Sequence, residues 1–193
     1  MAVIGSKCLA GAIYSFWPSD FVYTNKEEAW ANSIPCMKEL CEYAGERDID
    51  IALEILNRFE TYMINTVDEC LEYIKKVNDP HCKILVDTFH ANIEEDSIPD
   101  AFRKAGKLLA HVHVGENNRT LPGMNNTIPW KEIGKACKEI GYDGTIVMEP
   151  FLHAGGEVGK DIHVFRDLSH NASQEELDQM LKDSVKFLHE IFD

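Results

Sequence analysis

The chain has 193 residues, of which 45 % are hydrophobic, and its 19 basic and 33 acidic residues give a formal net charge of −14. The hydrophobic content suffices for one sizeable core and excludes a disordered or collagen-like chain. Proteins that bind nucleic acid or anionic lipid need clustered Lys and Arg, so the acidic balance argues against both kinds of partner.

The chain shows no sign of export or membrane insertion. No run of about 18 apolar residues occurs, so no membrane span is expected. Residues 1–7 lack a basic region followed by a long apolar stretch, so no signal peptide is expected either. The six cysteines form no Cys-x-x-Cys pair and no zinc-finger spacing, which indicates reduced thiols in a cytoplasmic protein.

Short apolar runs alternate along the chain with amphipathic segments. Continuous β-branched and apolar runs are typical of strands buried on both faces of a parallel sheet. They predict strands at residues 8–14, 49–53, 83–86, 108–114 and 144–148.

Helices are predicted between and after these strands. A capping-box pattern opens a helix at Thr66 and another at Ser173, and glycines end the helices at 100–105 and 129–140. A further helix is expected over 27–44, with Pro35 interrupting or kinking it.

Five strand–helix units predict an α/β protein with a parallel sheet. A doubly wound sheet would place a glycine-rich phosphate loop after its first strand, and none occurs there. A (β/α)8 TIM-barrel type instead places its chemistry at the carboxyl ends of several strands. We therefore predict one barrel-type domain over residues 1–193.

Ligand-type side chains stand at the ends of four consecutive predicted strands. Carboxylates and an imidazole that converge in a barrel mouth repel one another unless a cation lies among them. Ligation rich in carboxylate and free of thiolate suits Mn²⁺ or Mg²⁺, with Co²⁺ as a further alternative, better than a structural zinc, and Mn²⁺ is the metal we expect. The predicted ligands are Glu54, Asp87, His113 and Glu149. His111 lies on the same strand face as His113, and we interpret it as an inner-layer residue of the barrel.

Several of these residues lie in longer segments that resemble the ketose 3-epimerases, the D-tagatose and D-psicose (D-allulose) 3-epimerases of the xylose-isomerase-like barrel superfamily. The segments are 53–60 (LEILNRFE), 87–95 (DTFHANIEE), 113–119 (HVGENNR) and 148–151 (MEPF). The resemblance implies that the four predicted ligands bind a metal and that Glu54 and Glu149 are the catalytic carboxylates. It also implies that Glu60, His90 and Arg119 hold substrate oxygens and that Trp17 forms an aromatic wall.

The implied reaction is epimerisation at C3 of a free ketohexose by proton abstraction and return through an enediolate. An aldose–ketose isomerase or another sugar epimerase of the superfamily is the first alternative. A metal-dependent abasic-site endonuclease shares the barrel, but the net charge of −14 opposes it. A non-catalytic fragment is a further alternative.

Length sets one further expectation. A (β/α)8 barrel takes about 250 residues, whereas this chain supplies five strand units and the resemblance begins at the fourth strand of the family. The chain is therefore expected to form the C-terminal portion of a barrel, strands four to eight. The exposed sheet edges of such a portion, together with the family resemblance, lead us to expect a homo-oligomer, a dimer or a tetramer.

Overall fold

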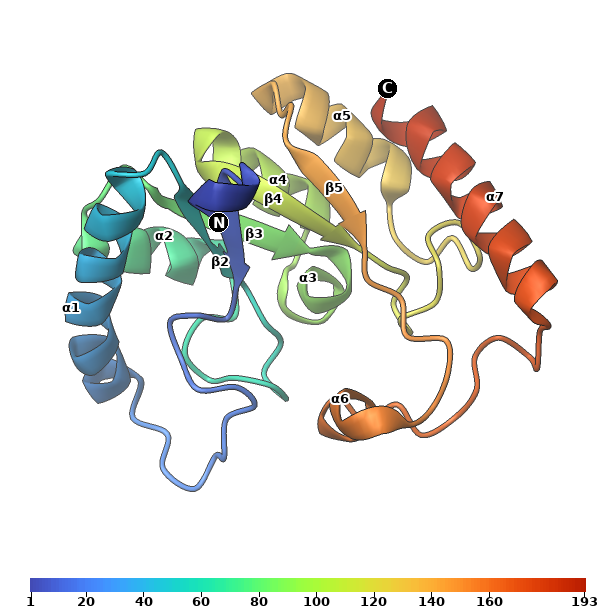
Figure 1. Ribbon diagram of the computed structural model, residues 1–193, viewed down its shortest axis with the longest axis horizontal. Coiled ribbons are helices and arrows are strands. Elements are labelled where there is room, and N and C mark those ends of the chain that lie inside the picture. The colour runs from blue at the N-terminus through green and yellow to red at the C-terminus, as the bar shows by residue number, and fades with distance from the viewer.

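A computed structural model describes all 193 residues. Its centre is one sheet of five parallel strands arranged in chain order. The strands are β1 (Cys8–Gly11), β2 (Asp50–Glu54), β3 (Cys82–Asp87), β4 (Leu109–Val114) and β5 (Thr145–Met148). Sequential parallel pairing gives the curved wall of a half-barrel (Figure 1), so the barrel-type α/β prediction is confirmed at this level.

Helices lie along the outer side of this wall (Figure 1). The long ones are α1 (Lys26–Gly45), α2 (Val67–Val77), α4 (Ile98–Ala105), α5 (Trp130–Ile140) and α7 (Gln174–Phe192). Two short helices, α3 (Thr88–Glu94) and α6 (Gly156–Asp161), follow β3 and β5 at the carboxyl ends of the strands. None of the helices is both long enough and apolar enough to cross a membrane.

The core lies between the outer face of the sheet and these helices. Alternate residues of the central strands, such as Leu53 and its β3 partner Ile84, are fully buried there. Successive side chains in a strand point to opposite faces of the sheet. The side chains of Glu54, Asp87 and His113 therefore point to the concave face, away from this core. One periodicity thus places Leu53 and Ile84 in the core and the three ligand-type side chains on the concave face.

The edge strands depart from the prediction of strands buried on both faces. All four residues of β1 are only half-buried, and Thr145 and Val147 of β5 are exposed. The prediction is wrong for these strands because each has a neighbour on one side only. The run at 8–14 also forms a shorter strand than predicted, ending at Gly11 with a φ of +143°.

Helix boundaries follow the predicted caps with two differences. Pro35 lies inside one continuous helix, α1, and does not interrupt it. The Ser173 capping box forms completely, whereas Thr66 caps α2 and the Glu69 carboxylate turns to the backbone N–H of Asn65. Helices α3 and α6 were not predicted, since each is too short to show a period.

Candidate active site

Four ligand-type side chains meet at the carboxyl ends of the strands. The last residue of β2 and the last residue of β3 each carry a carboxylate. The penultimate residue of β4 is a histidine, and a glutamate follows β5 directly. One potential ligand atom from each lies within 4.8 Å of all the others. This ligand cluster comprises Glu54, Asp87, His113 and Glu149.

His113 lies between the two glutamates of the cluster. Its Nδ1 atom is 3.2 Å from Glu54 Oε1 and 3.2 Å from Glu149 Oε2. Burial lowers the pKa of His113, but the carboxylates of Glu149 and Glu54 have the larger, opposite effect and raise the pKa to about 10. The imidazole therefore carries a proton and supplies positive charge where the two carboxylates converge.

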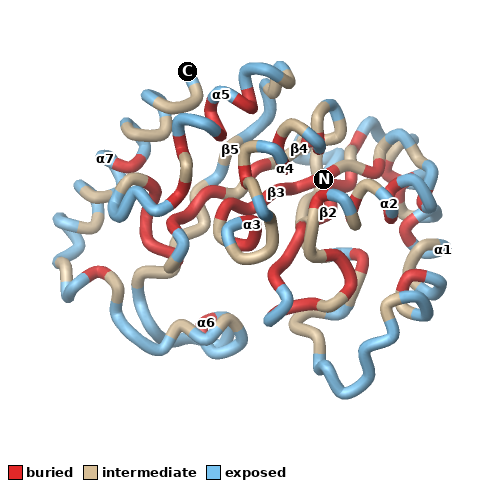
Figure 2. Tube along the Cα trace, turned by 180° about the vertical axis from the view of Figure 1, so that it is seen from behind, coloured by how far each residue is buried: buried red, intermediate tan, exposed pale blue.

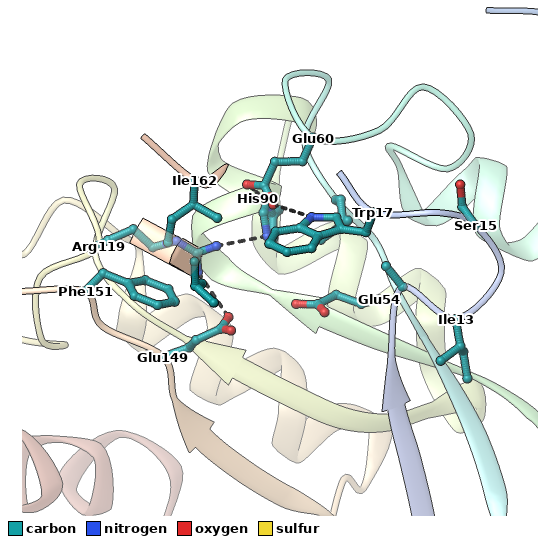
Figure 3. A pocket seen from close by; sticks show the side chains of 13 residues that line it. Ile13, Ser15, Trp17, Glu54, Glu60, His90, Arg119, Glu149, Phe151 and Ile162 are labelled. Carbon is teal, nitrogen blue, oxygen red and sulfur yellow. Dashed lines mark hydrogen bonds and ion pairs between the residues drawn. The ribbon is translucent and has the colours of Figure 1, made fainter. Parts of the chain in front are cut away.

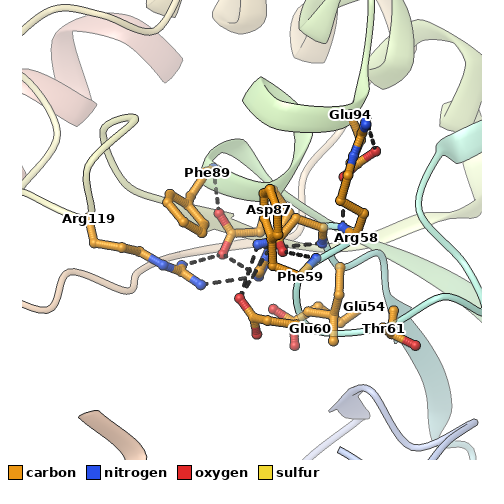
Figure 4. Close-up of polar contacts among 12 residues, drawn as sticks. Glu54, Arg58, Phe59, Glu60, Thr61, Asp87, Phe89, Glu94 and Arg119 are labelled. Atoms are coloured by element: carbon orange, nitrogen blue, oxygen red, sulfur yellow. Dashed lines mark hydrogen bonds and ion pairs between the residues drawn. The ribbon is translucent and has the colours of Figure 1, made fainter. Parts of the chain in front are cut away.

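Asp87 is the most enclosed member of the cluster, with a side chain that is 0 % exposed. Its Oδ1 accepts a hydrogen bond of 2.7 Å from the Phe89 N–H and thereby caps α3, while Oδ2 accepts one of 2.8 Å from Arg119 Nη1 (Figure 4). Burial raises the pKa of Asp87, but the charge of Arg119 and the hydrogen bond from the Phe89 N–H hold it below its usual range. Asp87 is thus an ionised carboxylate in a fixed orientation.

Arg119 comes from the loop after β4 and is 7 % exposed. Besides Asp87, its Nη1 donates to Glu149 Oε2 at 3.2 Å. The guanidinium carbon lies 3.9 Å from the ring centroid of Phe89 and 5.3 Å from that of Phe151, which is cation–π geometry. These contacts hold the one arginine of the site against the ligand cluster.

His90, 1 % exposed, is oriented by Asn57. The backbone N–H and the side-chain amide of Asn57 both face His90 Nδ1, at 3.1 and 2.8 Å. Nδ1 is therefore the acceptor and the ring proton is placed on Nε2. His90 Nε2 is 3.1 Å from Arg119 Nη2, so the imidazole and the guanidinium lie side by side on the cavity lining.

Glu60 and Trp17 adjoin these donors. Glu60 accepts hydrogen bonds of 3.0 Å from Asn57 Nδ2 and of 3.0 Å from Trp17 Nε1. The indole is thereby fixed with one face toward the cavity, as Figure 3 shows. A series of hydrogen bonds thus runs from Trp17 through Glu60 and Asn57 to His90 and fixes the side chains of this wall of the site.

These groups line a cavity of about 410 Å³, within the usual range for a small-molecule site. One side is polar, with Glu54 and Glu149 at its base and the donors of His90 and Arg119 beside them (Figure 3). The lining also includes apolar side chains, among them Ile13, Val158 from α6 and Ile162 just after it. The cavity therefore suits a small ligand that has both polar and apolar surface.

The structure brings together all eight predicted site residues, with Asp87 and His113 behind the cavity lining and the other six on it. His111 is outside the ligand cluster and stacks edgewise on His113 with ring centroids 5.1 Å apart. Sequence reasoning assigned no role to Asn57, Phe89 or Phe151, although each lies in a segment of the family resemblance. The α6 residues carried no signal in the sequence.

The ligand cluster fits a divalent metal ion. Its three carboxylates and one imidazole supply hard oxygen and nitrogen ligands, and no thiolate is among them, since all six cysteines are free and lie elsewhere. Arg119 neutralises only part of the charge of the three carboxylates, and a cation bound among the ligand atoms, in place of the proton on His113 Nδ1, would complete the balance.

Comparison with known proteins agrees with this geometry. The D-psicose 3-epimerase of Ruminiclostridium cellulolyticum is 46 % identical over 180 residues, which are 93 % of this chain and 61 % of that protein. The crystal structure of D-psicose 3-epimerase with D-tagatose from Clostridium cellulolyticum H10 superposes with a TM-score of 0.92 at 44 % identity, covering 96 % of this chain and 64 % of that one. A D-psicose 3-epimerase structure determined in the presence of D-fructose gives a TM-score of 0.95 at 38 % identity, with 99 % and 66 % covered.

The resemblance to ketose 3-epimerases is thereby confirmed, and the chain spans about three fifths of the length of the curated relative. The family described as xylose isomerase-like TIM barrel matches residues 2–188. With five parallel strands, outer helices and a polar site at the carboxyl ends of the strands, the chain belongs to the xylose isomerase-like TIM barrel family.

Proposed function

We propose that this protein epimerises a ketose at C3 in a metal-dependent reaction, with Mn²⁺ as the metal. The observation that carries the proposal is the convergence of four ligand atoms within 4.8 Å at the base of a cavity that His90 and Arg119 face with N–H donors. The D-psicose 3-epimerases to which the chain is similar support the same reaction.

The metal would be held by the ligand cluster and would act as a Lewis acid, polarising the C2 carbonyl of the sugar and making the C3 proton more acidic. Removal of that proton leaves an enediolate, whose negative charge is spread toward O2. Return of a proton to the opposite face of C3 then gives the epimer.

Glu54 and Glu149 are the proposed acid/base pair. They come from β2 and after β5, with β3 and β4 between them, and each lies 3.2 Å from His113 Nδ1. A sugar above this histidine would have one glutamate toward each face. One ionised carboxylate removes the C3 proton, the other in protonated form donates, and the roles exchange for the reverse direction.

His90 and Arg119 are proposed to bind the oxygens at the reacting end of the sugar. Their Nε2 and Nη2 atoms lie 3.1 Å apart, so a substrate oxygen beside both nitrogens would accept from each on binding. Donors aimed at the position where negative charge develops stabilise the enediolate. Glu60 is proposed to accept from a substrate hydroxyl, and Trp17 to pack against the sugar carbons.

Deuterium incorporation tests the reaction and its position. The Mn²⁺-loaded protein is incubated in D₂O with fructose, psicose, tagatose and sorbose, and each sugar is followed by NMR. Label at C3 with formation of the C3 epimer supports the proposal. Label at C1 would replace it with aldose–ketose isomerisation. Chelated protein is the control and should incorporate no label.

We also propose that the five strands correspond to strands four to eight of the barrel, and that the chain assembles as a dimer or tetramer. The unpaired edges of β1 and β5 and the exposed apolar side chains of Phe16, Val22 and Phe59 support this. Light scattering during gel filtration measures the assembly. If no exchange is seen, the chain is fused to the part of the Ruminiclostridium cellulolyticum relative that it does not match, and the deuterium assay is repeated. Activity of the fusion would show that the site was incomplete, whereas an inactive fusion would show that the site cannot catalyse the reaction.

A further inference from the structure

A carboxylate outside the cavity, that of Glu116, is fully buried at 0 % exposure and contacts no Lys or Arg. Five donors surround it: the backbone N–H groups of Gly123, Asn126 and Thr127 at 2.8, 3.2 and 2.9 Å, the Thr127 hydroxyl at 2.7 Å and the Trp130 indole N–H at 3.0 Å. An ionised carboxylate is stable when buried only if donors replace its hydration.

These donors belong to the long loop between β4 and α5 and to the first residue of α5. The loop therefore wraps around one side chain, with its outer residues Met124 to Thr127 exposed and Glu116 inside. Burial raises the pKa of Glu116, but the hydrogen bonds from Thr127, Gly123 and Trp130 bring it below its usual value. The carboxylate stays ionised and acts as the centre around which the loop is folded.

The same loop presents Arg119 to the active site. The backbone of Glu116 brackets the turn, since its N–H donates to Thr120 O at 3.1 Å and its carbonyl accepts from Arg119 N–H at 3.0 Å. Arg119 has a φ of +66°, an unfavourable conformation for a residue with a side chain, which the surrounding contacts must hold in place.

The Arg119 turn is joined to the segment that carries Glu149. The Phe151 N–H donates to the Arg119 carbonyl at 2.8 Å, and Glu149 lies two residues earlier. The loop thus holds the Arg119 backbone on one side of the turn. On the other side, the Arg119 carbonyl ties the loop to the segment after β5. Glu116 itself does not line the cavity.

We propose that Glu116 is a positioning residue whose buried carboxylate holds Arg119, and through it the Glu149 segment, in place for the reaction. The effect of Glu116 on catalysis rests on the proposed function. Its effect on the position of Arg119 is independent of that function. The two parts are therefore tested by separate measurements.

The first measurement is chemical labelling of Arg119 with phenylglyoxal, which reacts with accessible guanidinium groups, followed by mass spectrometry. Arg119 in the wild-type protein is 7 % exposed and should react slowly, whereas Arg58, with a side chain 62 % exposed, provides an internal reference. In Glu116→Gln the Arg119 rate should rise several-fold relative to Arg58. Thr127→Ala removes one donor to the same carboxylate, so it should give a smaller rise and covers the case in which Glu116→Gln does not fold.

Glu95→Gln is the matched control. The Glu95 carboxylate is also partly buried and accepts a backbone N–H, that of Val67 at 2.6 Å. It follows the C-terminal end of α3, whereas the β4–α5 loop contacts Thr88 at the other end of that helix. Its removal should lower the melting temperature without changing the Arg119 labelling rate. An Arg119 rate unchanged in both Glu116→Gln and Thr127→Ala, or raised equally in Glu95→Gln, would overturn the proposal.

The second measurement is a double-mutant cycle on C3 epimerisation well below the melting temperature. Glu116→Gln should lower kcat/KM by about ten- to a hundredfold, because small displacements of positioning groups cost that much. In an Arg119→Lys background the same change should have less than about a twofold effect, since residues that act through one another are not additive. Equal effects in both backgrounds would mean that Glu116 does not act through Arg119 and would overturn this part of the proposal. If neither the wild type nor the fusion described above shows turnover, the proposed function fails and the labelling result alone decides.

Discussion

The two walls of the active site differ in how firmly they are held. On the β2–β3 wall, the side chains of Asp87 and His90 are 0 % and 1 % exposed, and each receives hydrogen bonds from backbone N–H groups. On the β5–α6 wall, the Glu149 side chain is 33 % exposed and is held only by Arg119 and His113, while Val158 is 52 % exposed. Figure 2 shows the same division, with buried chain around β2 and β3 and exposed chain along α6.

The difference follows from sheet position. β3 has a hydrogen-bonded neighbour on each side and helices over its outer face, whereas β5 pairs with β4 alone. The first wall is therefore organised by folding, and the second depends on groups that reach across from the β4–α5 loop. Changes on the first wall should cost stability and activity together, while changes on the second should cost activity alone.

The largest separation of activity from stability is expected for Glu149→Gln. Loss of a general acid/base group typically costs about a hundred- to ten-thousandfold in rate, and this half-exposed side chain supports little of the fold. We expect deuterium incorporation at C3 to fall by that factor with a melting temperature close to wild type. Glu175→Gln, on an exposed turn of α7, is the control and should keep full activity. Retained turnover in Glu149→Gln would remove it from the acid/base pair.

Asp87→Ala should have the largest effect on stability. It strips the cap from α3 and leaves the guanidinium of Arg119, 7 % exposed, without its shortest partner. Breaking a buried ion pair from one side costs about 3–5 kcal/mol. Urea denaturation of metal-free protein measures the free energy of unfolding, with Glu149→Ala as the comparison from the other wall. Equal losses in the two variants would show that the walls are held alike.

The sequence predicted the firm wall better than the loose one. Glu54 and Asp87 terminate strands whose apolar periodicity is continuous, so their convergence follows from parallel pairing in register. Val158 lies on a six-residue helix that has no period to detect, and Ile162 follows that helix directly, so their place on the cavity depends on a loop of irregular backbone. The exposure of β1 and β5 could not be foreseen either, because an apolar run does not reveal whether its strand has one neighbour or two.

Metal binding should join the two walls. Mn²⁺ at a hundred times its dissociation constant stabilises a protein that binds it only when folded by about 2.7 kcal/mol. We expect the melting temperature of chelated protein to rise on addition of Mn²⁺, and most of that rise to be lost in Glu149→Ala, which removes the ligand from the looser wall. Glu157→Ala, an exposed acid on α6, should leave the rise intact. A melting temperature indifferent to Mn²⁺ would contradict the proposed metal site.

Acid should weaken the firm wall through Asp87. The pKa of Asp87 is lower in the folded chain than its usual value of 3.8, because the charge of Arg119 and the hydrogen bond from the Phe89 N–H outweigh burial. The unfolded chain then binds the proton more readily, so the stabilisation is complete above pH 3.8 and is lost as the pH falls through the folded-state pKa. Metal-free wild-type protein should lose unfolding free energy more steeply between these values than Asp87→Asn. Parallel pH profiles would contradict the ion pair.

The smallest effect is expected where the loose wall is most exposed. Val158→Ala removes two methyl groups from a side chain that is 52 % exposed, so the free energy of unfolding should change by no more than about 0.5 kcal/mol. Val86→Ala is the same substitution one residue before Asp87, at 1 % exposure, and should cost about 2 kcal/mol or more. Because Val158 lines the cavity, its truncation should act on KM for the ketose and leave kcat nearly unchanged. A large loss of stability in Val158→Ala would mean that α6 is packed as firmly as the β2–β3 wall, and the contrast between the walls would then rest on Glu149 alone.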